Sequence, residues 1–167
     1  MRYPLFLNLT KQKVVVVGGG QVATRKIRAL RAAAAAVTVI SPEATAAIRQ
    51  WSQAKRIRWI RRPYRASDLR RACLVVAATD RDEINRRVCA EARRHKLLVN
   101  SAAPPSTGNF IVPSVIHRGG ITIAISTGGA SPAFAKRLRR DLERLFRRGY
   151  PALLKKMAGM RKRHHDE

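Results

Sequence analysis

Four valines run directly into three glycines near the start of the chain, and this junction constrains the fold more than any other feature. Residues 13–17 read Lys-Val-Val-Val-Val, which is typical of a short parallel strand buried on both faces. Residues 18–20 are all glycine, and residues 22–36 form an amphipathic, helix-favouring stretch. A second β-branched strand at residues 37–40 stops at a Ser-Pro pair. The pattern predicts one right-handed βαβ unit.

Strands and helices continue to alternate after this unit. We expect strands at residues 57–60, 74–78 and 97–100, helices at 44–53 and 82–95, and a helical turn at 66–71. Alternation at this spacing predicts an α/β fold of the Rossmann type, a parallel sheet with helices on both faces.

The pattern changes after about residue 113. Residues 120–127 alternate as a half-buried strand does, and Ser131-Pro132 predicts the start of a helix that runs to about residue 148. The apolar stripe of this helix predicts packing on a partner subunit; it consists of Phe134, Leu138, Leu142 and Leu145.

The chain thus divides into three predicted parts. Residues 1–113 are expected to form an NAD-binding domain, and residues 114–150 a small α+β segment for dimerisation and substrate binding. Residues 151–167 are expected to be a truncated C-terminal helical region or a basic tail.

The glycines belong to a motif that reads Gly18-x-Gly20-x-x-Ala23, placed between a strand and a helix. In dinucleotide-binding proteins the first glycine allows the tight turn and the second lets the backbone approach a pyrophosphate. Gln21 and Val22 would offer backbone N–H groups at the start of the helix. The alternative is a glycine turn with a purely structural role.

Ser41, Pro42 and Glu43 follow the second strand, where an acidic residue about 20 positions after the glycines would hold the ribose hydroxyls. Ser41 occupies the usual acidic position and Glu43 comes slightly late. We expect these three residues to border the cofactor, while the spacing leaves NAD and NADP both open.

Thr79 and Asp80 follow the strand at residues 74–78, so they lie on the same edge of the predicted sheet. They would border the ribose or the nicotinamide. The alternative is that Asp80 or Asp82 merely caps the next helix.

Several short segments, together, carry a family resemblance. They are Pro4-Leu5-Phe6, residues 17–23 with Arg25-Lys26, residues 77–80, Asn85, Asn100, residues 109–113 (Asn-Phe-Ile-Val-Pro) and residues 126–132 (Ser-Thr-Gly-Gly-Ala-Ser-Pro). The chain resembles the precorrin-2 dehydrogenase family, the N-terminal module of siroheme synthase, over residues 2–150. The resemblance implies NAD-dependent oxidation of precorrin-2, a polycarboxylate tetrapyrrole, to sirohydrochlorin in siroheme biosynthesis. It also implies a homodimer, with the tetrapyrrole between the nucleotide domain and the dimer contact.

One position departs from the family. By the resemblance, an aspartate before a proline acts as the acid/base or orienting residue, but this chain has Ala103 there. A methyl group cannot accept a proton, which weakens the case for ferrochelatase activity in particular. Dehydrogenation can survive because the cofactor carries the hydride. NAD-dependent dehydrogenation stays the expected function, and Ala103 is the chief support for the alternative, a catalytically weakened relative that binds NAD or a tetrapyrrole as a carrier or sensor.

Asn100, His117 and Thr127 are the candidate catalytic residues that remain. His117 is a possible substitute base, as are Ser101 and a carboxylate of the substrate itself, although a loop or interface role is common for such a histidine. Thr127 lies in a Ser-Thr-Gly-Gly turn whose N–H groups could meet a carboxylate, or the glycines merely permit the turn.

The chain is strongly basic, with 35 Lys and Arg against 10 Asp and Glu and a net charge of +25. This charge favours a polyanionic partner. Specific nucleic-acid binding is not expected, because the basic residues are spread along every helix and only 5% of residues are aromatic.

No apolar run approaches the ~20 residues of a membrane span, and no signal peptide is evident, so the sequence predicts a cytoplasmic protein. Cys73 and Cys89 lack metal-binding spacing, so no metal site is predicted.

Overall fold

The computed structural model describes residues 2–118 and 121–148. Within them the chain forms two compact units, one of residues 5–111 and one of residues 2–4 together with 112–148. The third predicted part, residues 151–167, lies outside the described residues.

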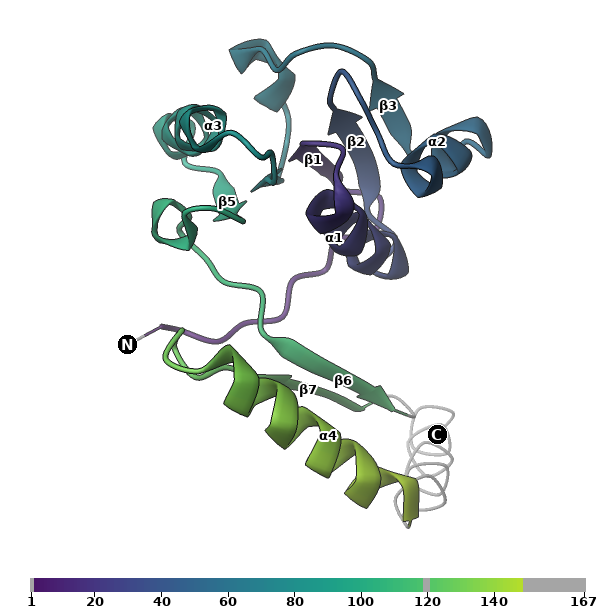
Figure 1. Cartoon of the computed structure of the whole chain (residues 1–167), viewed down its shortest axis with the longest axis vertical. Coiled ribbons are helices and arrows are strands. Elements are labelled where there is room, and N and C mark those ends of the chain that lie inside the picture. Colours follow the sequence, from purple (N-terminus) through teal and green to yellow (C-terminus); the bar gives the residue numbers. More distant parts are fainter. Residues whose placement is uncertain (1, 119–120, 149–167) are drawn as a thin grey trace, which may run out of the picture. The chain divides into compact units, whose positions relative to one another are not determined.

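The first unit is a five-stranded parallel sheet with the strand order β3-β2-β1-β4-β5. Its elements, in chain order, are β1 (Lys13–Val17), α1 (Gln21–Ala32), β2 (Ala36–Ile40), α2 (Ala46–Gln53), β3 (Arg58–Ile60), the 3-10 helix η1 (Ala66–Leu69), β4 (Leu74–Ala77), α3 (Asp82–Arg94), β5 (Leu98–Ser101) and the 3-10 helix η2 (Pro105–Thr107). Figure 1 labels β1, β2, β3 and β5 of this sheet, with α1, α2 and α3 beside it. The predicted α/β fold of the Rossmann type is confirmed. Its glycine turn follows the central strand, at the carboxyl edge of the sheet.

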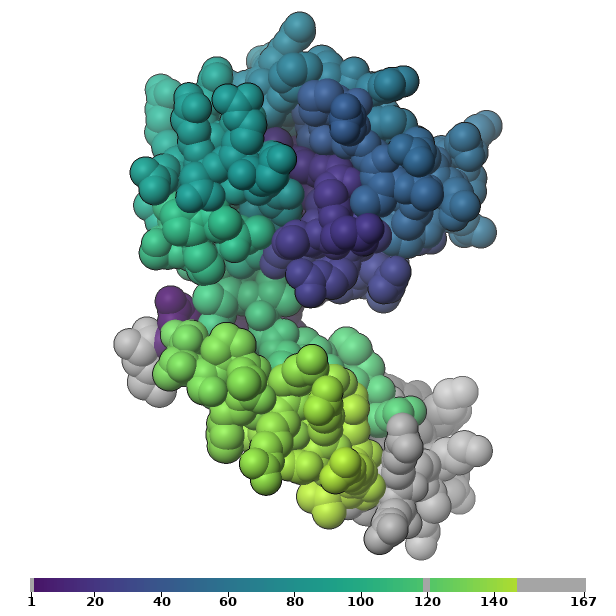
Figure 2. Space-filling view, in the orientation of Figure 1, coloured from purple at the N-terminus to yellow at the C-terminus, as the bar shows by residue number. Residues whose placement is uncertain are grey.

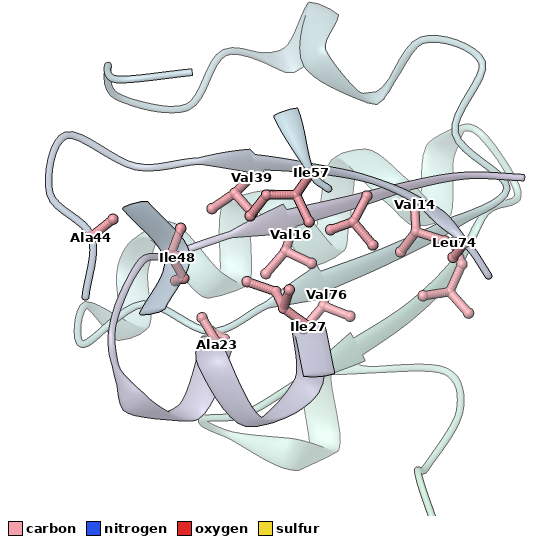
Figure 3. Close-up of a cluster of buried hydrophobic side chains, with 13 residues drawn as sticks. Val14, Val16, Ala23, Ile27, Val39, Ala44, Ile48, Ile57, Leu74 and Val76 are labelled. Carbon is pink, nitrogen blue, oxygen red and sulfur yellow. The ribbon is translucent and has the colours of Figure 1, made fainter. Parts of the chain in front are cut away.

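Both faces of the sheet are covered, which explains the run of valines in β1. Val14 and Val16 pack with Ile27 of α1 and Ile48 of α2 on one face (Figure 3). The alternate valines of β1 pack on the other face with residues from η1 and α3; these are Leu69, Val88, Cys89 and Ala92. The four valines are at most 2% exposed. Burial of such a side chain contributes about 1.5–3 kcal/mol, so the strand anchors the sheet.

Helix α1 ends at Ala32, four residues before the predicted end. The backbone of Ala34 has a positive φ of 55°, and its carbonyl oxygen accepts a hydrogen bond from the N–H of Lys11. The parallel pairing of β2 with β1 begins at Ala36. Tertiary pairing therefore overrides the helix propensity of the last alanines.

The second unit consists of the antiparallel strands β6 (Ser114–Arg118) and β7 (Ile121–Ile125) and the helix α4 (Pro132–Arg148), which packs against both strands. Strand β6 was not expected from the sequence. The Ser131 hydroxyl accepts a hydrogen bond from the N–H of Phe134, as an N-cap does. Arg2 donates to the carbonyl oxygen of Gly128, which attaches the start of the chain to this unit.

Part of the apolar stripe on α4 lies on the surface. Phe134 is 57% exposed and Leu145 is 64% exposed, and in the space-filling view α4 forms a continuous green-to-yellow surface (Figure 2). None of the described helices is long and apolar enough to span a bilayer.

Candidate active site

The glycine turn between β1 and α1 is packed against the neighbouring loops. Gly18 has a positive φ of 121°, and a Cβ there would lie 2.2 Å from the carbonyl oxygen of Ala78. A Cβ on Gly19 would lie 2.0 Å from the carbonyl oxygen of Glu43. A Cβ on Gly20 would meet no atom within 4 Å. The first two glycines are therefore needed for packing, and the third faces open space that a pyrophosphate can use. The need for Gly19 was not predicted from the sequence.

The amino end of α1 is open to an anion. Its N-cap, Gly20, has no side chain to accept hydrogen bonds, and the first turn contains no acidic residue. Gln21 and Val22 are exposed. The N–H groups of this turn and the positive end of the helix dipole are thus available to a phosphate.

Ser41, Pro42 and Glu43 lie beside the glycine turn. The hydroxyl oxygen of Ser41 would be 2.9 Å from a Cβ on Gly19. The N–H of Thr45 donates to the carbonyl oxygen of Gly19, which ties this loop to the turn. Pro42 and Glu43 are exposed, so the Glu43 side chain is accessible at this edge.

The loop after β4 is held by Asn85 of α3, whose side chain is fully buried. Its Oδ1 accepts from the N–H and the hydroxyl of Thr79, at 3.0 and 2.8 Å. Its Nδ2 donates to the carbonyl oxygens of Thr79 and Ala103, at 3.0 and 2.9 Å. One amide therefore connects the loops that follow β4 and β5. The role of Asn85 was missed from the sequence, where it appeared only as part of the resemblance.

Neither aspartate near this loop caps α3. The N-cap of α3 is Arg81, without a capping side chain, and Asp82 lies in the first turn. The N–H of Arg81 is instead bonded to the Thr79 hydroxyl. The alternative interpretation of Asp80 or Asp82 as a helix cap is therefore wrong, and Asp80 is exposed at the carboxyl edge of the sheet.

Ala103 is partly buried in the loop after β5. Its carbonyl oxygen accepts from the Ser101 hydroxyl at 3.1 Å, in addition to Asn85. Ser101 is 4% exposed. Burial of this hydroxyl away from an incoming substrate disfavours Ser101 as a substitute base.

Asn100 is 6% exposed and both polar atoms of its side chain are in hydrogen bonds. Its Nδ2 donates to the carbonyl oxygen of Phe110 at 3.0 Å. Its Oδ1 accepts from the Nζ of Lys26 at 2.6 Å. Burial, and secondly the charge of Arg25, lower the pKa of the Lys26 ammonium group. The contact joins α1 to β5, and no sequence pattern indicated it.

His117 and Thr127 both lie in the second unit. The Nδ1 atom of His117 is 3.0 Å from the Thr122 hydroxyl, and the ring is exposed. The Thr127 hydroxyl accepts from the N–H of Ser131, within a turn whose two glycines have positive φ values of 67° and 102°. Thr127 thus stabilises the turn before α4.

Comparison with known proteins places these features in a family. Residues 5–114 match the model of an NAD(P)-binding domain, and residues 118–145 match the central domain of sirohaem biosynthesis proteins. The precorrin-2 dehydrogenase of Bacillus subtilis is 32% identical over 160 residues, which cover 96% of this chain and 98% of that protein. The chain belongs to the precorrin-2 dehydrogenase family.

Two further similar proteins support this family membership. A solved structure of a precorrin-2 dehydrogenase superposes with a TM-score of 0.80 at 35% identity, covering 90% of this chain and 74% of that one. A siroheme synthase from Nitrosococcus oceani is 39% identical over 92% of this chain, but this chain spans only 33% of its length. The resemblance seen in the motifs is confirmed, and the first unit is an NAD(P)-binding domain.

Proposed function

We propose that this protein is an NAD-dependent precorrin-2 dehydrogenase, which oxidises precorrin-2 to sirohydrochlorin in siroheme biosynthesis. The observation that carries the proposal is the match to the Bacillus precorrin-2 dehydrogenase over nearly the full length of both chains. The open glycine turn supports it, because Gly20 and the uncapped start of α1 leave space and N–H groups for a dinucleotide.

The described residues fit the cofactor. The N–H groups of Gln21 and Val22 would hold the pyrophosphate, and Ser41, Pro42 and Glu43 would border the adenosine ribose. Thr79 and Asp80 would border the nicotinamide end. We favour NAD over NADP because the exposed carboxylate of Glu43 would repel a 2′-phosphate. Bound NAD would accept the hydride that leaves precorrin-2.

The chain's own residues would then position the substrate and receive a proton. Loss of a hydride and a proton requires a proton acceptor, and Ala103 cannot be one. His117 is exposed and has an Nδ1 contact only to a hydroxyl, which leaves its Nε2 as a candidate acceptor. A carboxylate of the substrate is the other candidate. Iron insertion into sirohydrochlorin is disfavoured, since by the resemblance it depends on the carboxylate that Ala103 replaces.

Anaerobic incubation of the protein with precorrin-2 and NAD tests the proposal. We expect the sirohydrochlorin absorption spectrum to appear together with NADH, and NADP to support a lower rate. Tetrapyrrole binding without turnover would contradict the enzyme and would favour the alternative, a carrier or sensor that the missing carboxylate at position 103 suggests. Heat-inactivated protein is the control for spontaneous oxidation.

We also propose that the protein is a homodimer that associates through the second unit. Phe134 and Leu145 of α4 and Val112 are more than half exposed, although their side chains are apolar. We expect sedimentation or light scattering to give twice the chain mass, and Phe134→Asp to shift the protein towards the monomer. Ala133→Asp, which adds the same charge at an exposed position on the same helix, is the matched control. A wild-type monomer at micromolar concentration would contradict the dimer.

The cytoplasmic location stays a prediction.

A further inference from the structure

Lys26 is a partly buried cation for which the described part of the chain provides no carboxylate partner. Its ammonium group is bonded instead to a neutral amide oxygen, that of Asn100, at 2.6 Å. Removing a charge from water costs free energy that a neutral amide offsets only in part. An arriving anion would offset the remainder.

Asn100 holds this ammonium group in place. The amide is 6% exposed, and its orientation is set because Nδ2 donates to the carbonyl oxygen of Phe110, leaving Oδ1 towards Lys26. An ammonium group has three donors, of which one is used here. The other two can meet an incoming oxygen atom without breaking the bond to Asn100.

The position suits a substrate rather than the pyrophosphate. Asn100 is on β5, at the strand end that leads to Ala103, whereas the glycine turn follows β1. Strand β4 lies between these two strands in the sheet. Lys26 therefore reaches from the cofactor-binding helix α1 to Asn100 near the end of β5, three residues before Ala103, where the family, by the resemblance, places its acidic residue.

We propose that Lys26, positioned by Asn100, binds a carboxylate of the tetrapyrrole. The inference rests on the proposed function, and it assigns Asn100 a positioning role. The lowered pKa of Lys26 agrees with a cation whose charge is stabilised only when an anion is present. Arg25 and Arg28, which are also on α1, are exposed and would contribute only to the overall positive electrostatic field of the protein.

The test is equilibrium binding of sirohydrochlorin, followed by its absorbance, to wild type, Lys26→Gln and Arg28→Gln. The two variants lose the same charge from the same helix, and glutamine keeps an N–H donor at position 26, one bond closer to the backbone than the lysine Nζ. We expect Lys26→Gln to raise the dissociation constant about tenfold or more, and Arg28→Gln to raise it less than about twofold. NAD affinity is expected to stay at the wild-type value in both, and the melting temperature is expected to fall in neither, because the charge removed at position 26 is disfavoured by burial.

Equal weakening of sirohydrochlorin binding in the two variants would overturn the inference, because the overall positive electrostatic field of the protein would then explain the binding. The outcomes remain distinguishable from those for the proposed function, which is tested by turnover of the wild type. If the wild type turns over precorrin-2 but both variants bind sirohydrochlorin equally weakly, only the role of Lys26 is refuted. If Lys26→Gln alone binds weakly and the wild type shows no turnover, the carboxylate contact is supported and the enzymatic function is refuted. A wild type that binds no tetrapyrrole would refute both proposals.

Discussion

An Ala103→Asp variant is expected to oxidise precorrin-2 about 10- to 100-fold faster than the wild type, since a positioned general acid or base contributes roughly that much or more. Ala103 is partly buried, and the hydrogen bonds that hold its loop are accepted by its main-chain carbonyl oxygen from Asn85 and Ser101. The side chain can therefore change without disturbing these hydrogen bonds. Initial rates of sirohydrochlorin formation at saturating NAD measure the effect.

The control is Ser106→Asp, which adds the same charge at an exposed position three residues further along. It should leave the rate within about twofold, because an exposed and screened charge contributes little. An unchanged rate in Ala103→Asp would show that another group already performs the proton transfer. A rise in both variants would point to the general field instead.

Replacing Gly18 by alanine is expected to abolish detectable NAD binding and to lower the free energy of unfolding by about 2–4 kcal/mol. The backbone is in a region that L-residues rarely adopt, with φ at 121°, and the new Cβ would collide with the carbonyl oxygen of Ala78. The turn must therefore move away from β4, taking the start of α1 with it. Urea unfolding and a fluorescence titration with NADH measure the two effects.

Gly20→Ala separates these two effects. The added methyl group would meet no protein atom within 4 Å, and the φ of −80° is ordinary, so we expect stability within about 0.5 kcal/mol of the wild type. The methyl group would nevertheless occupy the space proposed for the pyrophosphate and weaken NAD binding. Wild-type affinity in Gly20→Ala would place the dinucleotide elsewhere.

The fold could be predicted from local signals, but contacts between distant residues could not. The apolar strands and the glycine motif were sufficient to predict the sheet and its first crossover, because periodicity and turn chemistry act over a few residues. Strand β6 was missed since its sequence, Ser-Val-Ile-His-Arg, is short and has no clear alternation. The end of α1 was placed late because pairing of β2 with β1, rather than propensity, decides it.

In the candidate site, too, features set by local sequence could be predicted and contacts between distant residues could not. Gly18 and Gly20 follow from a spacing rule, whereas Gly19 is needed because of the carbonyl of Glu43, which only the folded chain brings near. The contact between Lys26 and Asn100 joins residues 74 positions apart. No pattern within either segment encodes it, because both side chains are common surface types and their burial depends on how α1 lies over the sheet.

The buried amide of Asn85 makes two loops behave as one. It satisfies main-chain groups of both Thr79 and Ala103. Either loop, moving alone, would leave a buried polar group unpaired, at a cost of about 1–3 kcal/mol. The loop proposed to touch the nicotinamide and the loop that carries the alanine in place of the family carboxylate should therefore open and close together, so that exchange of cofactor and exchange of tetrapyrrole become kinetically linked.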